Sequence, residues 1–277
     1  PSTHADGIMS EWRKDPFSDR WVIMAQHRAA RPYDFQWQVQ RRPDAFCPFC
    51  VGQESQTPEP VLVLRDRSAD DQFPWHVRVV PNRYPAVEDG PASTWQQSGP
   101  LCGGTAPGVH EVLIESPEHD IPFAELPLSR LALCFEAVRQ RFSDWRREGR
   151  FGYALMFKNV GPLAGASLEH PHSQLMALGE EPLERGRQLA LIDAWTERTG
   201  QCLACDVLAA ETREATRILG GTDRFLAYCP SASRFPYEVR IMHRWHQRAF
   251  EDAEAGELRE LSVCVQRVLI MLARVLG

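Results

Sequence analysis

Hydrophobic residues follow two patterns along this chain, and each pattern predicts one kind of element. Apolar residues recur at helical spacing after Ser129, which is the expected N-cap, and Gly149 lies beyond the expected end. A second amphipathic helix is predicted from about Ala255 onward. Short apolar or alternating runs predict strands. The expected strands are 21–25, 76–80, 109–116, 151–160, 170–178, 224–230 and 237–242.

The order of these elements predicts an α+β fold with two halves. Two C-x-x-C pairs, starting at Cys47 and Cys202, lie 202 − 47 = 155 positions apart, and strands follow each of them. Such a repeat favours duplication of one unit. We expect an N-terminal half at 1–180 and a C-terminal half at 181–277, each with an antiparallel sheet and helices. The segment 88–108 is rich in Gly, Pro and Ser and predicts a long mobile loop.

Composition and charge restrict the class of protein. With 277 residues, 43% of them hydrophobic, the chain can bury a large core. It has no run of eighteen apolar residues and no signal-like start, so we expect a cytoplasmic protein without a membrane span. The net charge of -6 argues against binding of long nucleic acid, although a local arginine pocket for one nucleotide is compatible with it.

The cysteines change the picture further. Four of the eight form the two C-x-x-C pairs, a pattern that favours metal binding over disulfides in a cytoplasmic protein. Cys47 and Cys50 have the spacing of two thiolate ligands of a tetrahedral zinc ion, and His119 and His170 are candidates for the other two. The alternatives are a redox pair, which usually stands at a helix N-terminus, and cysteines that only pack.

The stretch Glu169–Gln174, EHPHSQ, carries the most specific chemistry. In a strand, His170 and His172 point to the same face. If His170 binds metal, His172 is left to attack a phosphorus atom, with its other ring nitrogen donating to an acceptor such as the His170 carbonyl. Gln174 shares that face and could donate to a phosphate, and the backbone N–H groups of 164–167 could cradle the charge. Two ordinary strand histidines are the alternative.

These residues resemble a known family. The segment 157–178 is similar to the active-site segment of galactose-1-phosphate uridylyltransferases, within the histidine-triad superfamily, whose signature is H-P-H-x-Q. The segments 15–32, 47–50, 79–87 and 109–120 also resemble this family, so the likeness covers nearly the whole chain. It implies two histidine-triad-like halves. The apolar helix that ends the chain has no following strand, so we expect the second half to be truncated at its C-terminus.

The resemblance also implies roles for individual residues. It implies one zinc ion bound by Cys47, Cys50, His119 and His170, and His172 as the nucleophile that takes the nucleotidyl group, assisted by Gln174. The implied nucleotide and phosphate contacts are Arg28, Arg31, Asn82, Asn159, Ser167 and Gln174. For the two arginines, a solvated loop is the alternative. Because the family works as dimers, we expect a homodimer.

The second cysteine pair resembles a different branch of the family. Cys202 and Cys205 look like those of ADP-glucose phosphorylase, whose branch binds a second zinc ion and usually has a serine where Pro171 stands. The implied second site would use Cys202, Cys205 and His246, and its fourth ligand in the family lies in a strand beyond Gly277. A structural or vacant cysteine pair is the alternative.

Three functions are therefore compatible with the sequence. In the leading hypothesis, UDP-glucose gives UMP to His172 and galactose-1-phosphate receives it, a reaction of galactose and carbohydrate metabolism. In the second, an ADP-sugar leaves AMP on His172 and inorganic phosphate collects it as ADP. The third is a non-catalytic, zinc-stabilised nucleotide-binding protein.

Overall fold

The computed structural model describes residues 11–24, 46–66, 72–166 and 168–276, which form two compact units. The large unit comprises 39–182 and 247–266, and the small unit comprises 1–38, 183–246 and 267–277. The chain passes from large to small between Pro182 and Leu183, next to the expected division at 180/181. The units are nevertheless not two consecutive halves, because each is built from segments that are separated along the chain.

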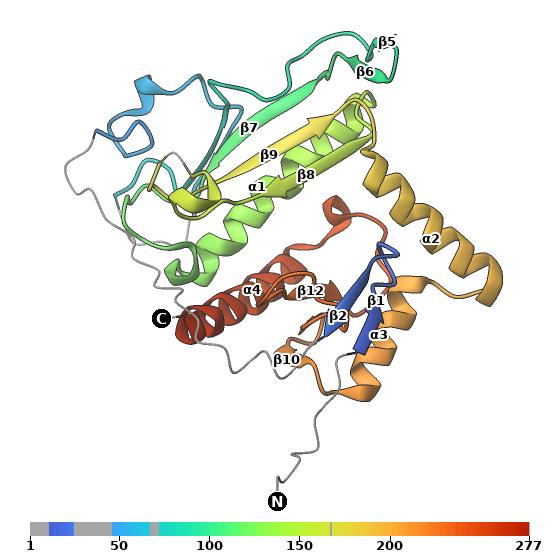
Figure 1. Ribbon diagram of the computed structural model, residues 1–277. Coiled ribbons are helices and arrows are strands. Elements are labelled where there is room, and N and C mark those ends of the chain that lie inside the picture. Colours follow the sequence, from blue (N-terminus) through green and yellow to red (C-terminus); the bar gives the residue numbers. More distant parts are fainter. Residues whose placement is uncertain (1–10, 25–45, 67–71, 167, 277) are drawn as a thin grey trace, which may run out of the picture. The chain divides into compact units, whose positions relative to one another are not determined.

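A five-stranded antiparallel sheet organises the large unit. Its order is β3-β4-β7-β9-β8, and β7, β9 and β8 lie side by side in Figure 1. The strands are β3 (Leu62–Leu64), β4 (Val77–Pro81), β7 (Gly108–Ile114), β9 (His172–Leu178) and β8 (Tyr153–Phe157). Four of them coincide with predicted strands. The register sets Ile114 of β7 opposite His172 of β9, so the expected histidine strand occupies the interior of the sheet.

The two faces of this sheet bury different kinds of side chain. On one face, Val112 and Ile114 belong to a core cluster with Phe49 and Trp75. On the other, Glu111 forms an ion pair at 2.7 Å with Arg141 of α1 (Leu128–Glu148). This alternation is the period-two pattern of a strand covered on both faces.

Helix α1 begins earlier than its sequence suggested. The N-cap is Pro127, whose carbonyl accepts the N–H groups of Arg130 and Leu131 at 2.9 and 3.0 Å, so the predicted Ser129 cap is wrong. Proline favours the extended backbone that leads into a helix, and it has no N–H group that would need a partner there. The C-terminal prediction is confirmed, since Gly149 adopts φ 71° in the left-handed region and donates to the Trp145 carbonyl.

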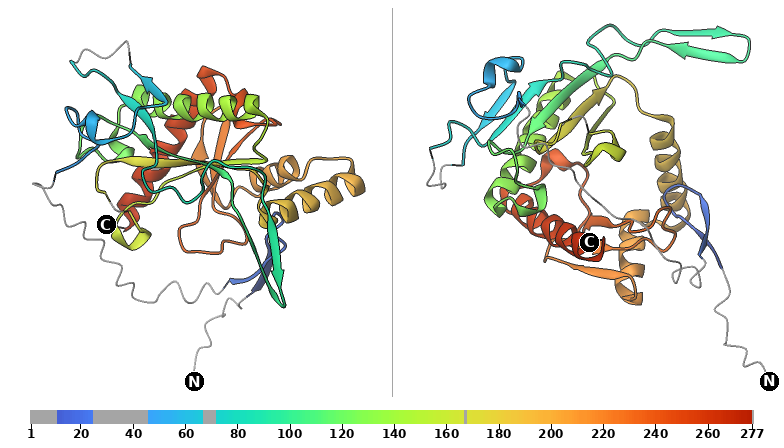
Figure 2. Two further views of the ribbon diagram at one scale, coloured as in Figure 1. Left: turned by 90° about the horizontal axis from the view of Figure 1, so that it is seen from above. Right: turned by 60° about the vertical axis from the view of Figure 1, so that its left-hand side comes forward.

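The segment 88–108 is not simply a loop. It contains the hairpin of β5 (Trp95–Ser98) and β6 (Leu101–Gly104), drawn as a projecting two-stranded ribbon in Figure 2. Gly99 and Pro100 connect the strands, and Gly99 has φ 57°, the positive value that tight hairpin turns need. All eight strand residues are exposed, which explains why no apolar alternation marked them.

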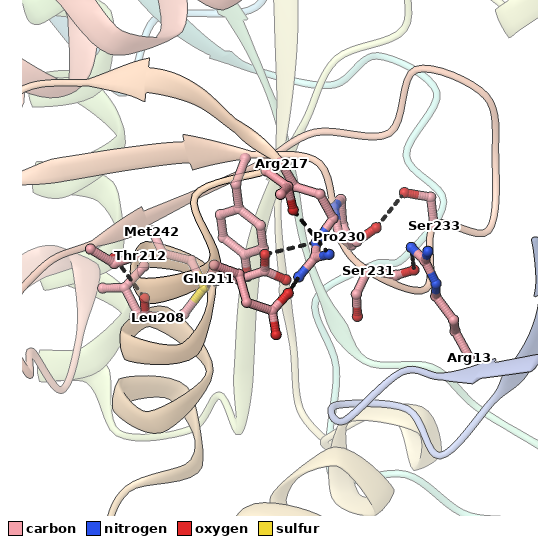
Figure 3. A network of polar contacts seen from close by, with 12 residues as sticks. Arg13, Leu208, Glu211, Thr212, Arg217, Pro230, Ser231, Ser233 and Met242 are labelled. Carbon is pink, nitrogen blue, oxygen red and sulfur yellow. Dashed lines mark hydrogen bonds and ion pairs between the residues drawn. The ribbon is translucent and has the colours of Figure 1, made fainter.

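The small unit contains a hairpin, a second sheet and two helices. The hairpin pairs β1 (Glu11–Lys14) with β2 (Trp21–Met24), and the antiparallel sheet has the order β10-β11-β12. Its other elements are α2 (Leu183–Thr199), α3 (Leu203–Glu214), β10 (Ile218–Gly221), β11 (Phe225–Tyr228) and β12 (Arg240–His243). Figure 3 shows Arg217 beside Glu211 of α3, and Arg13 beside Ser231. Arg13 donates to the Ser231 carbonyl at 3.0 Å.

The last helix, α4 (Ala255–Leu276), begins where predicted. Within the large unit, Gln266 donates to the Leu126 carbonyl at 2.9 Å. The rest of the helix, from Arg267 onward, belongs to the small unit. Short 3-10 turns occur at Glu54–Gln56, Phe123–Glu125, Pro162–Ala164 and Phe250–Asp252. None of the described helices is long and apolar enough to span a membrane. The fold is thus a mixture of helices and antiparallel sheets, which confirms the α+β prediction.

Candidate functional site

The structure brings the four residues expected around zinc together in the large unit. The ligand atoms of Cys47, Cys50, His119 and His170 all lie within 4.8 Å of one another. The Cys50 sulfur is 3.3 Å from Nδ1 of His119 and 3.7 Å from Nδ1 of His170. A turn presents the cysteines, His119 follows β7, and His170 lies two positions before the first residue of β9. Three separate segments therefore converge on one point.

Only one ring nitrogen of His170, Nδ1, is available to bind a metal. Its side chain is 1% exposed, and Nε2 lies 2.8 Å from the Ser116 carbonyl, which can only accept. Nε2 therefore carries the proton and Nδ1, which faces Cys50, has the free lone pair. Burial lowers the pKa of His170 to about 4, chiefly because the charged ring would be desolvated. The imidazole is thus neutral at pH 7, as a metal ligand must be.

The thiol of Cys50 also favours its uncharged form. Burial raises the pKa of Cys50 to about 11, and the neighbouring Cys47 contributes to the rise. A divalent cation bound between these atoms would lower the pKa again, because its positive charge stabilises the thiolate form. Two sulfur and two nitrogen donors form a tetrahedral set suited to zinc. The residues present therefore fit the metal that the resemblance implies.

His172, the first residue of β9, lies next to this cluster. Its Nδ1 is 2.8 Å from the His170 carbonyl, so the expected hydrogen bond is present. Because a carbonyl only accepts, Nδ1 carries the proton and Nε2 has the lone pair. The ring of Phe49 contacts the His172 ring edge-on at 5.6 Å between centroids. Orientation and tautomer are thus fixed together.

A buried ion pair, not anticipated from the sequence, holds the main chain at His172. Lys158 donates to the His172 carbonyl at 2.9 Å and to the Glu115 carboxylate at 2.6 Å. Glu115 is fully buried and also accepts from the Ser173 hydroxyl at 2.5 Å. The one available signal was that Lys158 is one of only two lysines in the chain. Its partner could not be inferred, because 43 positions separate them.

The other expected contact residues have mixed outcomes. Asn82 follows β4 and lies beside His110, whose Nε2 is 2.8 Å from Oε1 of Gln174. Asn159 is half-buried, two positions beyond β8. Three residues, Arg28, Arg31 and Ser167, lie outside the described residues.

The expected N–H cradle at 164–167 is only partly available. The N–H groups of Ala164 and Ala166 both donate to the Gly161 carbonyl at 3.2 Å. The prediction that this run presents its amides together is therefore wrong for those two. The loop instead uses them to close its own turn, with Gly161 and Gly165 at positive φ of 81° and 84°.

The second predicted cluster also forms, in the small unit. Cys202 is the N-cap of α3, Cys205 stands in its first turn, and the Cys205 sulfur is 3.6 Å from Nδ1 of His246. Together the three residues make a compact group, but Cys205 and His246 are exposed. Among the residues that the structure describes, this site has three donors, one fewer than a closed structural zinc site.

Comparison with known proteins places this geometry in a family. The model of the galactose-1-phosphate uridyl transferase N-terminal domain matches residues 2–182. The chain belongs to the galactose-1-phosphate uridylyltransferase family. This match covers the CPFC turn, the HPH segment and the whole five-stranded sheet.

Relatives that match most of the chain have two different names. ADP-glucose phosphorylase of Arabidopsis thaliana is 30% identical, over 96% of this chain and 75% of the relative. Galactose-1-phosphate uridylyltransferase of Thermotoga maritima is 29% identical, over 92% of this chain and 73% of the relative. The crystal structure of the Arabidopsis phosphorylase with bound ADP-glucose superposes with a TM-score of 0.76 at 27% identity, covering 97% of this chain and 79% of that one. The fold is that of this family, and the family and its relatives support nucleotidyl transfer.

Proposed function

We propose that the protein transfers a nucleoside monophosphate from a sugar nucleotide to an acceptor phosphate through a covalent bond to His172. The observation that carries this proposal is the hydrogen bond from Nδ1–H of His172 to the His170 carbonyl, 2.8 Å long. It leaves an unprotonated Nε2, the form in which imidazole is a nucleophile.

The reaction takes place in two displacements at the same phosphorus. The Nε2 lone pair of His172 forms a bond to the α-phosphorus, and the bond from that phosphorus to the bridging oxygen breaks, releasing the sugar 1-phosphate. An oxygen of the acceptor phosphate then attacks the phosphorus, and the N–P bond electrons return to His172. The His170 carbonyl stabilises the positive charge that the ring acquires while the N–P bond forms.

The metal has a supporting role in this proposal. Cys47, Cys50, His119 and His170 would hold zinc, and the bound ion would fix the main chain of His170, the acceptor for His172. Asn82, Asn159 and Gln174, with Arg28, Arg31 and Ser167, are proposed to contact the nucleotide and its phosphates. The second cluster at Cys202, Cys205 and His246 is proposed as a weaker zinc site.

Two donor and acceptor pairs fit this chemistry. A uridylyltransferase would use UDP-glucose and galactose-1-phosphate, and the T. maritima relative has that name. A phosphorylase would use an ADP-sugar and inorganic phosphate, and the Arabidopsis relative, named ADP-glucose phosphorylase, matches 96% of the chain. Both pairs need the same nucleophile, and they differ only in the base and acceptor pockets.

A panel of UDP- and ADP-sugars, each with galactose-1-phosphate or phosphate as acceptor, tests the proposal and separates the two pairs. We expect one pair to turn over with parallel double-reciprocal lines, as a covalent intermediate requires. Intersecting lines would contradict the covalent intermediate. Nucleotide binding without release of sugar 1-phosphate would instead identify a non-catalytic binder. Sedimentation of the same protein tests the expected homodimer.

A further inference from the structure

His110 lies in the large unit between a main-chain donor and Gln174. Its Nδ1 is 3.0 Å from the N–H of Ala86, and its Nε2 is 2.8 Å from Oε1 of Gln174. The residue belongs to β7 and its side chain is buried. Neither the sequence patterns nor the family signature singled it out.

The main chain determines which ring nitrogen of His110 is protonated. An amide N–H can only donate, so Nδ1 of His110 must accept from Ala86 and carry no proton. In the neutral ring, the proton is then on Nε2, which donates to Gln174. Asn82 provides no competing acceptor: its nitrogen lies 3.2 Å from Nε2, while its Oδ1 already accepts from the N–H of Tyr84.

This assignment also orients the amide of Gln174. An N–H donor requires an acceptor, so the Gln174 atom at 2.8 Å must be the oxygen. The NH₂ group is then the free end of the amide, and none of the residues that the structure describes accepts from it. Gln174 and His172 occupy the same face of β9, two positions apart. The free donor is thus on the face that carries the nucleophile.

We propose that His110 is a positioning residue that holds the Gln174 amide with its NH₂ group directed to the substrate phosphate. Without the His110 proton, the Gln174 amide could rotate by half a turn and present its oxygen to a negatively charged phosphate. That orientation would repel the substrate instead of donating to it. The inference rests on the proposed function, because it assumes that a phosphate is bound beside His172.

The first test is a double-mutant cycle on the labelling of His172 by a sugar nucleotide radioactive in its α-phosphate. We expect His110→Phe to lower the saturating single-turnover rate by about 10- to 100-fold, with little change in the half-saturating donor concentration. In a Gln174→Ala background the same change should cost less than about twofold, because the group it positions is absent. His110→Gln, which keeps an N–H donor, should recover part of the rate.

A matched control separates positioning from general damage to the fold. His76 is also buried and its Nδ1 also accepts a main-chain N–H, from Asp66 at 2.7 Å. The effects of His76→Phe and Gln174→Ala should therefore multiply. Multiplying effects of His110→Phe and Gln174→Ala, or an undiminished rate in folded His110→Phe, would overturn the inference.

The second test needs no activity. The ¹⁵N resonances of the histidine rings should identify His110 as the neutral Nε2–H tautomer in the wild-type protein, with the ring signal assigned through the main-chain resonances of the same residue. A proton on Nδ1 would overturn the inference even if every variant failed to fold. Failure of wild-type protein to become labelled, with the Nε2–H tautomer present, would instead count against the proposed function.

Discussion

The two cysteine–histidine clusters of this protein begin from the same C-x-x-C motif and differ in their surroundings. In the large unit, Cys47 and His170 are buried, and a fixed tautomer turns the His170 lone pair toward the sulfurs. In the small unit, Cys205 and His246 are exposed, and the part of the chain that the structure describes brings three donors together there instead of four. The motif alone therefore specifies only two thiols. The buried neighbours decide whether a metal site becomes part of the core.

The difference extends to the residue beside each cluster. The carbonyl of His170 accepts from His172, so a metal ligand directly orients the proposed nucleophile. Three positions before His246, Nδ1 of His243 lies 2.9 Å from the Trp245 carbonyl, but this ring stands at the end of a short outer strand. We therefore expect the chemistry to depend on the first cluster, and the two regions can be compared variant by variant.

The largest expected effect separates His172 from His243. His172→Asn should lower nucleotidyl transfer by at least about 10³-fold, because it removes the nucleophile, whereas His243→Asn should keep most of the activity. The measurement is acid-labile, base-stable label on the protein after incubation with a donor labelled in the α-phosphate, without acceptor. His170→Asn should weaken metal binding first and activity as a consequence. Undiminished labelling of a folded His172→Asn protein would show that the nucleophile is another residue.

The next prediction compares how much each of the two candidate metal sites contributes to stability. Elemental analysis should find at least one zinc ion per chain, and Cys50→Ser should remove it and lower the free energy of unfolding by more than about 3 kcal/mol, since binding is coupled to folding. Cys205→Ser should cost no more than about 1 kcal/mol, because its site is exposed. A metal-free protein of full stability would contradict the role assigned to the first cluster.

Local patterns in the sequence predicted this site better than they predicted its support. His170, His172 and Gln174 follow from a two-residue period in one strand, and CPFC follows from ligand spacing. His110 and Glu115 acquire their roles only because β7 pairs with β9, with Ile114 opposite His172. That register is a property of the folded sheet and involves residues far apart in the chain. Single-strand patterns therefore could not reveal these partners.

Two of the missed elements, α2 and the hairpin of β5 and β6, share a different physical cause. No residue of α2 is buried, so it needs no continuous apolar stripe, and its sequence gives no clear helical period. The hairpin of β5 and β6 is likewise exposed on every residue. Burial creates the hydrophobic pattern from which elements are predicted. Exposed elements consequently escape a prediction that finds α1 and the interior strands.

A smaller effect compares two ion pairs that differ in the burial of the acid. Lys158 and Arg217 have equal side-chain exposure of 21%, but Glu115 is 0% exposed and Glu211 7%. Lys158→Met should lower the free energy of unfolding by about 3 kcal/mol, since it leaves a carboxylate in the core without a cation. Arg217→Met should cost less, about 1–2 kcal/mol, because Glu211 is buried but keeps slight contact with water. Equal losses in urea denaturation would mean that Ser173 alone suffices to hold Glu115.

The smallest effect concerns pH and the imidazole within the first cluster. The pKa of His170 is lowered to about 4 in the folded protein, chiefly by desolvation, against the ordinary 6.5. Above pH 6.5 both folded and unfolded chains keep the ring neutral, so its contribution to stability is constant there. As pH falls from 6.5 toward 4, the unfolded chain binds a proton that the folded chain resists, and stability is lost.

Between pH 7 and 5.5, this difference should lower the free energy of unfolding by about 1 kcal/mol in chelator-treated protein, by the linkage between pKa and stability. Metal-loaded protein should lose stability in the same direction and at least as steeply, because protons and zinc compete for Nδ1 of His170. Denaturation of wild type and His170→Gln at both pH values measures the effect. Equal slopes for the two chelator-treated proteins would mean that His170 does not cause the pH dependence.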